Sequence, residues 1–150
     1  MDYEDLTKEL FIQLEKFHQM KPTVEFASFH QGEILVLNYL YEHEKTEELP
    51  TQISNNLCLS TSRVAATLNS LEKKGFINRI MSTHDRRKII VSITDSGKEL
   101  VRKKREKIKA IFTEILEKMG EHDAREFIRI LGKLENIVGE IKFITNFFEE

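Results

Sequence analysis

A short helix that follows Ser60 carries groups that proteins use to contact nucleic acids. Residues 51–75 are typical of two short helices joined by a tight turn, and Ser60 is a good N-cap for the second. Val64, Leu68 and Leu71 would form the apolar back of that helix. Its opposite face then offers hydroxyl, amide, methyl and cationic groups, which bind phosphates and base edges. The candidate DNA contacts are Ser60, Thr61, Ser62, Arg63, Ala65, Ala66, Asn69, Ser70, Lys73 and Lys74.

A second group of candidate contacts surrounds a charged tip between two short strands. Residues 76–80 and 88–94 are rich in β-branched side chains, and apolar and polar residues partly alternate along them, which predicts a two-stranded ribbon. Asp85 and Arg87 are two residues apart, so we expect the carboxylate to hold the guanidinium in place for the electronegative minor groove. His84 and Arg86 would instead contact flanking phosphates. The candidate contacts of this wing are Arg79, His84, Asp85, Arg86, Arg87 and Lys88.

The charge of the chain is unevenly distributed. Residues 60–105 hold twelve Lys and Arg against four Asp and Glu, a net charge of +8, whereas the rest of the chain carries −10. A basic segment on an otherwise acidic protein indicates a polyanionic partner, and here that partner would be double-stranded DNA. The run of cations at residues 102–105 is interpreted differently, because blocks of like charge usually cover a solvated helix face.

Two small details support a helix-turn-helix between residues 51 and 75. The two helices would cross closely, with Ser54 as the small inner residue of the first and Val64 pointing back from the second. Cys58 would lie in the turn, where glycine is the usual residue because the backbone often needs a positive φ. Pro50 is well tolerated at the first helix start, and Thr94 would cap the helix that follows the ribbon.

Longer amphipathic segments flank this central part. We expect a helix of about five turns that ends near Lys21, a loop over residues 23–28, and a second helix over about residues 30–44. Two long helices are predicted over about residues 96–119 and 123–148. The expected fold is mainly α (α+β), a winged helix-turn-helix with long terminal helices.

The terminal helices carry more apolar surface than a domain of this size needs for its own core. We therefore expect residues 1–29 and 100–150 to form the dimerisation helices of a homodimer, and residues 30–99 to form the DNA-binding lobe. The alternative is an intramolecular three-helix bundle. The candidate dimerisation residues are Leu6, Leu10, Leu14, Leu131, Leu134, Val138, Ile141, Ile144 and Phe148.

Three runs of residues carry a family resemblance. Residues 71–77 (LEKKGFI), the tip Asp85-Arg86-Arg87 and residues 93–97 (ITDSG) resemble the signature of the multiple-antibiotic-resistance regulator (MarR) family. The similarity extends from about Leu35 to Leu100. It implies a homodimeric transcription factor, usually a repressor at a palindromic site. It also implies a pocket, between the dimer helices and the DNA-binding lobe, where a small phenolic or other ligand, an oxidant or a metal often relieves binding.

A small aromatic or phenolic effector is one signal that the chain could sense, and only the location of four residues supports it. The candidate pocket residues Phe17, His18, Phe29 and His30 flank the joint between the first two helices, although ordinary packing explains them equally well. A metal-responsive regulator is disfavoured because no two of the five histidines have helical pair spacing, so no metal site is assigned. A redox-responsive regulator would depend on Cys58, which we interpret as a half-buried small hydrophobe.

Several function classes are disfavoured. No glycine-rich phosphate loop, nucleophile motif or convincing carboxylate pair is present, so we expect neither an enzyme nor a cofactor. No apolar run is long enough to span a membrane, and the acidic start of the chain and its single cysteine favour the cytoplasm. A winged helix used only for protein contact remains the main alternative, and the +8 segment argues against it.

Overall fold

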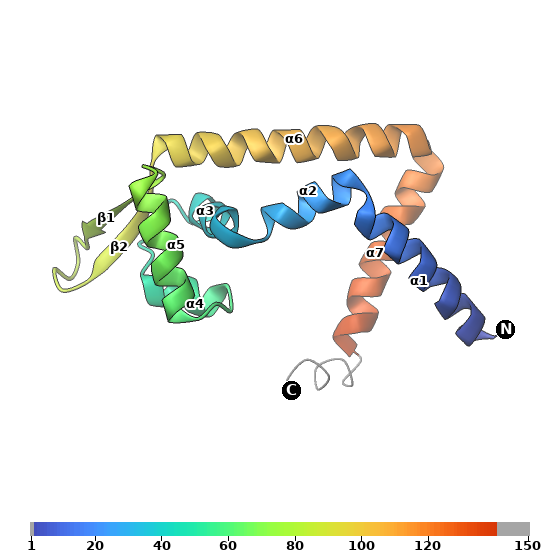
Figure 1. Ribbon diagram of the computed structural model, residues 1–150, viewed down its shortest axis with the longest axis horizontal. Coiled ribbons are helices and arrows are strands. Elements are labelled where there is room, and N and C mark those ends of the chain that lie inside the picture. Colours follow the sequence, from blue (N-terminus) through green and yellow to red (C-terminus); the bar gives the residue numbers. More distant parts are fainter. Residues whose placement is uncertain (1, 141–150) are drawn as a thin grey trace. The chain divides into compact units, whose positions relative to one another are not determined.

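The computed structural model describes residues 2–140, and it is mainly helical with one small sheet (Figure 1). Its elements are α1 (Tyr3–Gln19), α2 (Lys21–Phe29), α3 (Gly32–Glu42), α4 (Pro50–Asn56), α5 (Thr61–Lys73), β1 (Ile77–Met81), β2 (Ile89–Ile93), α6 (Asp95–Met119) and α7 (Glu121–Glu140). The chain divides into two compact units, the first ending at Ile108 and the second beginning at Lys109. The predicted fold class, a winged helix-turn-helix with long terminal helices, is confirmed.

The segment after α1 is helical, so the prediction of a loop over residues 23–28 was wrong. Helix α1 ends at Gln19, and α2 begins almost at once at Lys21. Pro22 lies in the first turn of α2, where its missing N–H needs no partner, and the Val24 N–H donates to the Met20 carbonyl across 3.1 Å. The first helix was expected to end near Lys21, and Pro22 beside that residue instead marks the start of the next helix.

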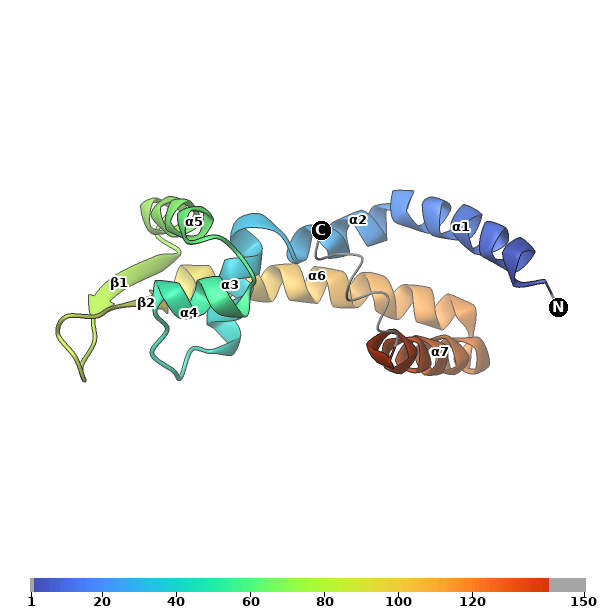
Figure 2. The same ribbon diagram turned by 90° about the horizontal axis from the view of Figure 1, so that it is seen from below.

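The helix-turn-helix has the internal contacts expected from its sequence. Ser54 is buried, and its Oγ donates to the Leu59 carbonyl across 2.6 Å, which closes the turn between α4 and α5. Val64 is almost fully buried on the facing helix. Cys58 has a φ of 51°, so the turn uses the left-handed conformation that normally favours glycine. Helices α4 and α5 lie beside each other, with the ribbon projecting past them (Figure 2).

The ribbon is antiparallel and is joined closely to α6. Ile77 pairs with Ile93 at its inner end and Met81 with Ile89 at its outer end. The Thr94 hydroxyl accepts a hydrogen bond from the Gly97 N–H across 3.1 Å, which confirms the predicted cap. Gly97 is buried against the ribbon, since a Cβ at this position would lie 2.3 Å from the Phe76 carbonyl oxygen.

One apolar core supports the helix-turn-helix and the ribbon. It is formed by side chains from α3, α4, α5, both strands and the start of α6, with Leu37, Ile53, Leu71, Ile77 and Val101 almost completely buried. The core therefore fixes the back of α5 and the inner end of the ribbon as one body. That arrangement leaves the front of α5 and the outer end of the ribbon exposed to solvent.

The terminal helices keep most of their apolar side chains exposed. Helix α1 has no buried residue, and Leu6, Leu10 and Leu14 are 44–56% exposed. Helix α7 likewise has no buried residue, and Leu131, Leu134 and Val138 lie on its exposed apolar stripe. The other three candidate dimerisation residues, Ile141, Ile144 and Phe148, lie outside the described residues. In residues 2–140, no helix combines the length and the apolar character that crossing a bilayer requires.

Candidate nucleic-acid interface

Helix α5 presents its polar groups on one open face. Ser60 is the N-cap, and its Oγ accepts a hydrogen bond from the Arg63 N–H across 3.2 Å. Val64, Leu68 and Leu71 are at most 1% exposed, which confirms them as the back of the helix. The exposed face carries Thr61, Ser62, Arg63, Ala65, Ala66, Asn69 and Lys73, and the exposed Glu72 lies on the same side of the helix. These groups form a continuous surface of donors, acceptors and methyl groups that is not used by the core.

Two of the candidate contacts on α5 are already bound to another helix. Glu33 of α3 accepts hydrogen bonds from Ser70 Oγ across 2.6 Å and from Lys74 Nζ across 2.7 and 2.9 Å. The Lys74 ammonium and the Ser70 hydroxyl together lower the pKa of the Glu33 carboxyl below its usual value. Ser70 and Lys74 therefore fasten the end of α5 to α3, a role that sequence reasoning did not predict.

Arg79 of β1 also has a structural partner. Its Nη2 donates to Asn69 Oδ1 across 2.7 Å, and its Nη1 lies 3.4 Å from the Glu72 carboxylate. Both partners are on α5, so the guanidinium joins the ribbon to the helix. Asn69 and Arg79 had each been assigned to DNA, and the structure brings them into contact with each other.

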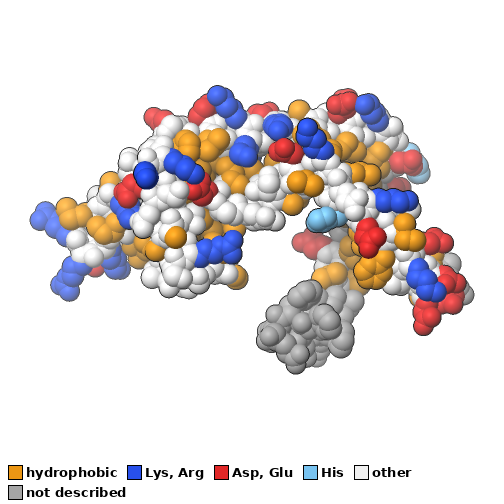
Figure 3. Space-filling model, viewed as in Figure 1, with side chains coloured by type: hydrophobic (Ala, Val, Ile, Leu, Met, Phe, Trp, Pro, Cys, Tyr) orange, Lys and Arg blue, Asp and Glu red, His pale blue; other side chains and the backbone are white. Residues whose placement is uncertain are grey.

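The predicted ion pair between Asp85 and Arg87 is absent, and this expectation was wrong. Asp85 Oδ1 accepts a hydrogen bond from the backbone N–H of Arg87 across 3.0 Å, which is the usual turn geometry for an aspartate two residues upstream. The carboxylate therefore shapes the turn of the wing tip, residues 82–88, and leaves the Arg87 guanidinium free of it. Figure 3 shows basic side chains gathered at this outer end of the ribbon.

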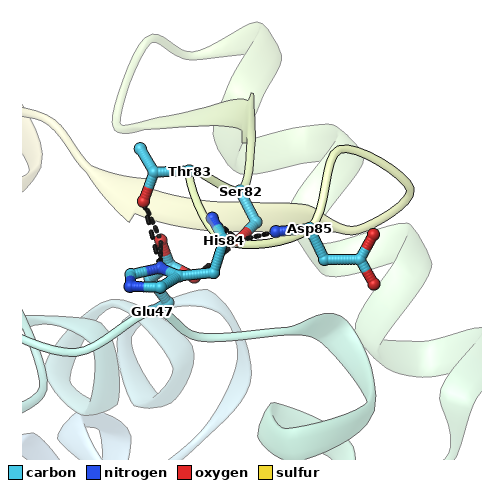
Figure 4. A network of polar contacts seen from close by, with 5 residues as sticks. All are labelled: Glu47, Ser82, Thr83, His84 and Asp85. Carbon is cyan, nitrogen blue, oxygen red and sulfur yellow. Dashed lines mark hydrogen bonds and ion pairs between the residues drawn. The ribbon is translucent and has the colours of Figure 1, made fainter.

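The start of the wing tip is held by Glu47, which lies between α3 and α4 (Figure 4). Its carboxylate accepts hydrogen bonds from Ser82 Oγ across 2.7 Å and from Thr83 Oγ1 across 2.9 Å, and it lies 3.3 Å from His84 Nδ1. The two hydroxyls, followed by the imidazole, lower the pKa of Glu47 to about 2. Sequence reasoning assigned Glu47 no role, because nothing in the local sequence indicates its distant partners.

The cations of the basic segment fall into two sets. Six of the twelve have a carboxylate within ion-pair distance, and the list is Lys74, Arg79, Lys98, Arg102, Lys103 and Arg105. Within residues 2–140 the other six have no such partner, and these are Arg63, Lys73, Arg86, Arg87, Lys88 and Lys104. All but Lys104 belong to α5 or the wing tip. The unneutralised charge is therefore concentrated on these two elements.

Helix α3 and the segment after it supply most of the neutralising carboxylates. Glu42 pairs with Arg105 across 2.5 Å, and Glu44 pairs with Lys98 across 2.8 Å. Arg105 also donates to Asn38, and its guanidinium lies 4.9 Å from the centre of the Tyr41 ring. Within the run at residues 102–105, Arg105 thus has a packing role as well as a solvated one.

The four candidate pocket residues do not share one hollow. Phe17 and His18 line a hollow of about 630 Å³ between α1 and α2. Phe29 lines a second hollow of about 250 Å³ together with Lys103, Lys104 and Lys107 of α6. The His30 ring is tilted against Phe26 and lies edge-on to Phe29, and its Nδ1 lies 3.1 Å from the Phe26 carbonyl oxygen. The assignment of these residues to an effector remains a prediction.

The described part of the chain offers little to a metal ion or a thiol sensor. In residues 2–140, no three His, Cys, Asp or Glu residues are grouped closely enough to form a metal site. Cys58 is a free and exposed cysteine in the turn before α5, so it is less buried than expected. Its strained backbone, rather than its thiol, is its most distinctive feature.

Known proteins resemble this chain over most of its length. The HTH-type transcriptional repressor YetL of Bacillus subtilis is 22% identical over 117 residues, which cover 78% of this chain and 70% of YetL. The crystal structure of YusO from Bacillus subtilis covers 91% of this chain and 99% of its own, with a TM-score of 0.75 and 23% identity. The crystal structure of Streptococcus pneumoniae FabT in complex with DNA covers 94% of this chain and 100% of the FabT chain, with a TM-score of 0.63 and 22% identity.

A family match covers the part of the chain that contains the candidate interface. Residues 17–108 match the family described as transcriptional regulator SarA/Rot, and this range includes the helix-turn-helix, the ribbon and the first half of α6. The family and the curated relatives are regulators of transcription, in agreement with the expectation that the chain is not an enzyme. Because the match spans more than half of its length, the chain belongs to the SarA/Rot family of transcriptional regulators, a MarR-like winged-helix family.

Proposed function

We propose that this regulator is a homodimeric, sequence-specific repressor that binds a palindromic operator in the cytoplasm. The observation that carries the proposal is the position of the unpaired cations. Arg63 and Lys73 border the exposed polar face of α5, and Arg86, Arg87 and Lys88 lie together on the wing tip. A helix of this kind fits the major groove, and a projecting basic ribbon fits the adjacent backbone or minor groove.

The proposed DNA contacts are narrower than those expected from the sequence. The exposed groups of α5 would read base edges and contact phosphates, and the three wing-tip cations would bind beside them. Ser70, Lys74 and Arg79 would act mainly by positioning these groups, since each is bound within the protein. The structure of FabT with DNA and the naming of YetL as a repressor support this proposal by similarity.

A homodimer would cover the apolar surfaces of the terminal helices. Leu131 is 48% exposed, Leu134 is 52% exposed and Leu10 of α1 is 56% exposed, and an exposed apolar stripe along a helix usually lies in an interface. A two-fold dimer places two identical DNA-binding lobes on the DNA, which matches the symmetry of a palindrome. Sedimentation velocity measures the mass directly, and Leu131→Asp is expected to shift it toward the monomer while Lys133→Ala does not.

A small aromatic ligand is the proposed signal for release. The hollow lined by Phe17 and His18 combines aromatic walls with several polar side chains, as small-molecule pockets often do. Binding there would favour one arrangement of the terminal helices, and a ligand that prefers that arrangement would reduce DNA affinity. Isothermal titration with phenolic acids tests this step, and His18→Ala is expected to weaken any binding that is found.

The decisive experiment is selection of DNA fragments by the purified full chain, followed by footprinting. We expect an enriched palindrome whose half-sites are centred about one helical turn, roughly 10 bp, apart. Arg63→Ala is expected to reduce binding, whereas Lys16→Ala, which removes a cation of α1 that has no carboxylate partner within residues 2–140, is expected to leave it unchanged. A failure to enrich any DNA would contradict the proposal and favour a winged helix that contacts proteins.

A further inference from the structure

We propose that Glu47 is a positioning residue for DNA binding, because its carboxylate holds the wing tip where its cations meet the DNA. The inference rests on the proposed function, in which Arg86, Arg87 and Lys88 contact the DNA. Glu47 itself is not assigned a contact with DNA. It would act through Ser82 and Thr83, which precede these cations in the chain. Glu47 binds both hydroxyls from a segment outside the ribbon.

Ser82 connects the carboxylate to the backbone of the wing tip. Its side chain is buried, and its Oγ donates to Glu47 across 2.7 Å. The same oxygen accepts hydrogen bonds from the backbone N–H groups of His84 and Asp85, across 3.1 and 3.3 Å. Asp85 in turn accepts from the Arg87 N–H. A continuous chain of hydrogen bonds therefore leads from Glu47 to the backbone of Arg87, a predicted DNA contact, and Figure 4 shows the part of this chain from Glu47 to Asp85.

The outer half of the ribbon depends on hydrogen bonds more than on apolar packing, and the N–H groups of Ser82 and Lys88 donate to the Lys88 and Asp85 carbonyls across 2.9 Å each. At the inner half, Val91 is buried and its N–H donates to the Glu48 carbonyl across 2.8 Å. Further out, Ile80 is 48% exposed, Met81 62% and Ile89 44%. Apolar packing is weaker there, so the polar contacts of Glu47 carry more of the restraint. Glu47 thus holds the outer half of the ribbon through its side chain, whereas Glu48 holds the inner half through its backbone carbonyl.

The charge of Glu47 makes its role testable. A carboxylate beside a cationic surface repels DNA phosphates, so electrostatics alone predicts that its removal tightens binding. Positioning predicts the opposite result, because a wing tip that is not held in place must be ordered when the DNA binds. Since the pKa of Glu47 lies near 2, the group is ionised at every pH at which binding would be measured. The two explanations therefore predict opposite changes in DNA affinity when the Glu47 carboxylate is removed.

The experiment measures the affinity of the full chain for the DNA fragment that selection enriches. Glu47→Gln and Glu47→Ala are expected to weaken binding, with a loss of about tenfold for alanine. Glu44→Gln is the matched control, because it removes a carboxylate three residues away that pairs with Lys98 of α6 rather than with the wing. Ser82→Ala breaks the same chain of hydrogen bonds without changing the charge, and it is expected to weaken binding as well.

A double-mutant cycle and amide exchange show whether Glu47 acts through the wing. Glu47→Ala combined with Arg87→Ala is expected to cost less than the sum of the single changes, because both act through one element. The amides of His84 and Asp85 are expected to exchange faster in Glu47→Ala, while those of α5 do not. Equal or tighter binding by both Glu47 variants, or strict additivity with Arg87→Ala, would overturn the proposal. A wild-type chain that binds no DNA would instead overturn the proposed function.

Discussion

Arg79 Nη2 of the first wing strand lies 2.7 Å from Asn69 Oδ1 of helix α5. The two residues were separate candidates for DNA contact, and the hydrogen bond gives them a shared task. It joins the wing to the helix that would enter the major groove. A cation that is already bound within the protein is expected to contribute less to the salt dependence of DNA binding than one that is not, and this difference can be measured.

The salt dependence of DNA binding distinguishes these two kinds of arginine. Each cation that neutralises a phosphate contributes about 0.9 to the slope of log K against log salt. Arg86→Ala is expected to lower the slope by about that amount per protomer, because Arg86 has no carboxylate partner among residues 2–140. Arg79→Ala is the matched control and is expected to change the slope less. Equal slopes for both variants would show that the internal pairing of Arg79 is broken on DNA.

Arg87 is expected to contribute to sequence preference as well as to charge. Its guanidinium is not held by Asp85, so it can enter a narrow minor groove, which A/T-rich flanks favour. Arg87→Ala is therefore expected to lose more affinity on operators with A/T-rich flanks than on those with G/C-rich flanks. Fluorescence anisotropy with both flank types measures the difference. An equal loss would mean that Arg87 contacts only phosphates.

The turn before α5 stores backbone strain at Cys58. Its φ of 51° costs an L residue about 1 kcal/mol, and glycine avoids that cost. Cys58→Gly is expected to be more stable than Cys58→Ala by about 1 kcal/mol, since both remove the thiol and only glycine relieves the strain. Urea unfolding at one fixed protein concentration provides the comparison. If alanine were as stable as glycine, the strain argument would fail.

Gly97 controls the approach of α6 to the ribbon. An added Cβ would lie 2.3 Å from the Phe76 carbonyl oxygen and 2.8 Å from Ile93 Cγ1, so one of the elements must move. Gly97→Ala is expected to destabilise the fold by about 1–3 kcal/mol. Gly132→Ala serves as the control, because nothing in residues 2–140 beyond its chain neighbours and the adjoining helix backbone would lie within 4 Å of the added Cβ there. Thermal unfolding of both variants decides the point, and a neutral Gly97→Ala would contradict the tight contact.

The stabilisation supplied by Glu47 is expected to depend on pH with a definite sign. Its pKa is lowered to about 2 in the folded state, whereas an unfolded glutamate titrates near its ordinary value of about 4.3. The contact therefore stabilises the fold fully above that ordinary value, and the effect is lost as the pH falls toward 2. The difference in unfolding free energy between wild type and Glu47→Gln is expected to be constant from about pH 7 to 5. A difference that grew on acidification would be incompatible with the lowered pKa.

The parts of this fold that were predictable from sequence are those with local causes. The back of α5, the Ser60 cap and the Thr94 cap each depend on residues within a few positions of one another. Periodicity and capping chemistry are sufficient to identify such features. Helix α2 was missed because Pro22 has the same appearance at the end of one helix and the start of another.

The parts that were not predictable depend on distant pairs. Glu33 binds Ser70 and Lys74 from nearly forty residues away, and Glu47 binds Ser82 at a similar separation. Which cations remain free for DNA follows from these pairings and not from the number of cations. The predicted pairing of Asp85 with Arg87 was wrong for a related reason, because a nearby backbone N–H competes successfully for the carboxylate.

The separation of bound and unbound cations has a consequence for how such a protein can change. Glu33, Glu42, Glu44 and Glu47 all belong to α3 or the segment after it, and their partners maintain the lobe. The remaining cations of α5 and the wing tip can be replaced without breaking any of these pairs. If the proposed interface is correct, operator preference would be modular: a laboratory could transplant a new DNA-contacting surface onto this lobe, and natural variation could do the same, while the supporting carboxylates stay as they are.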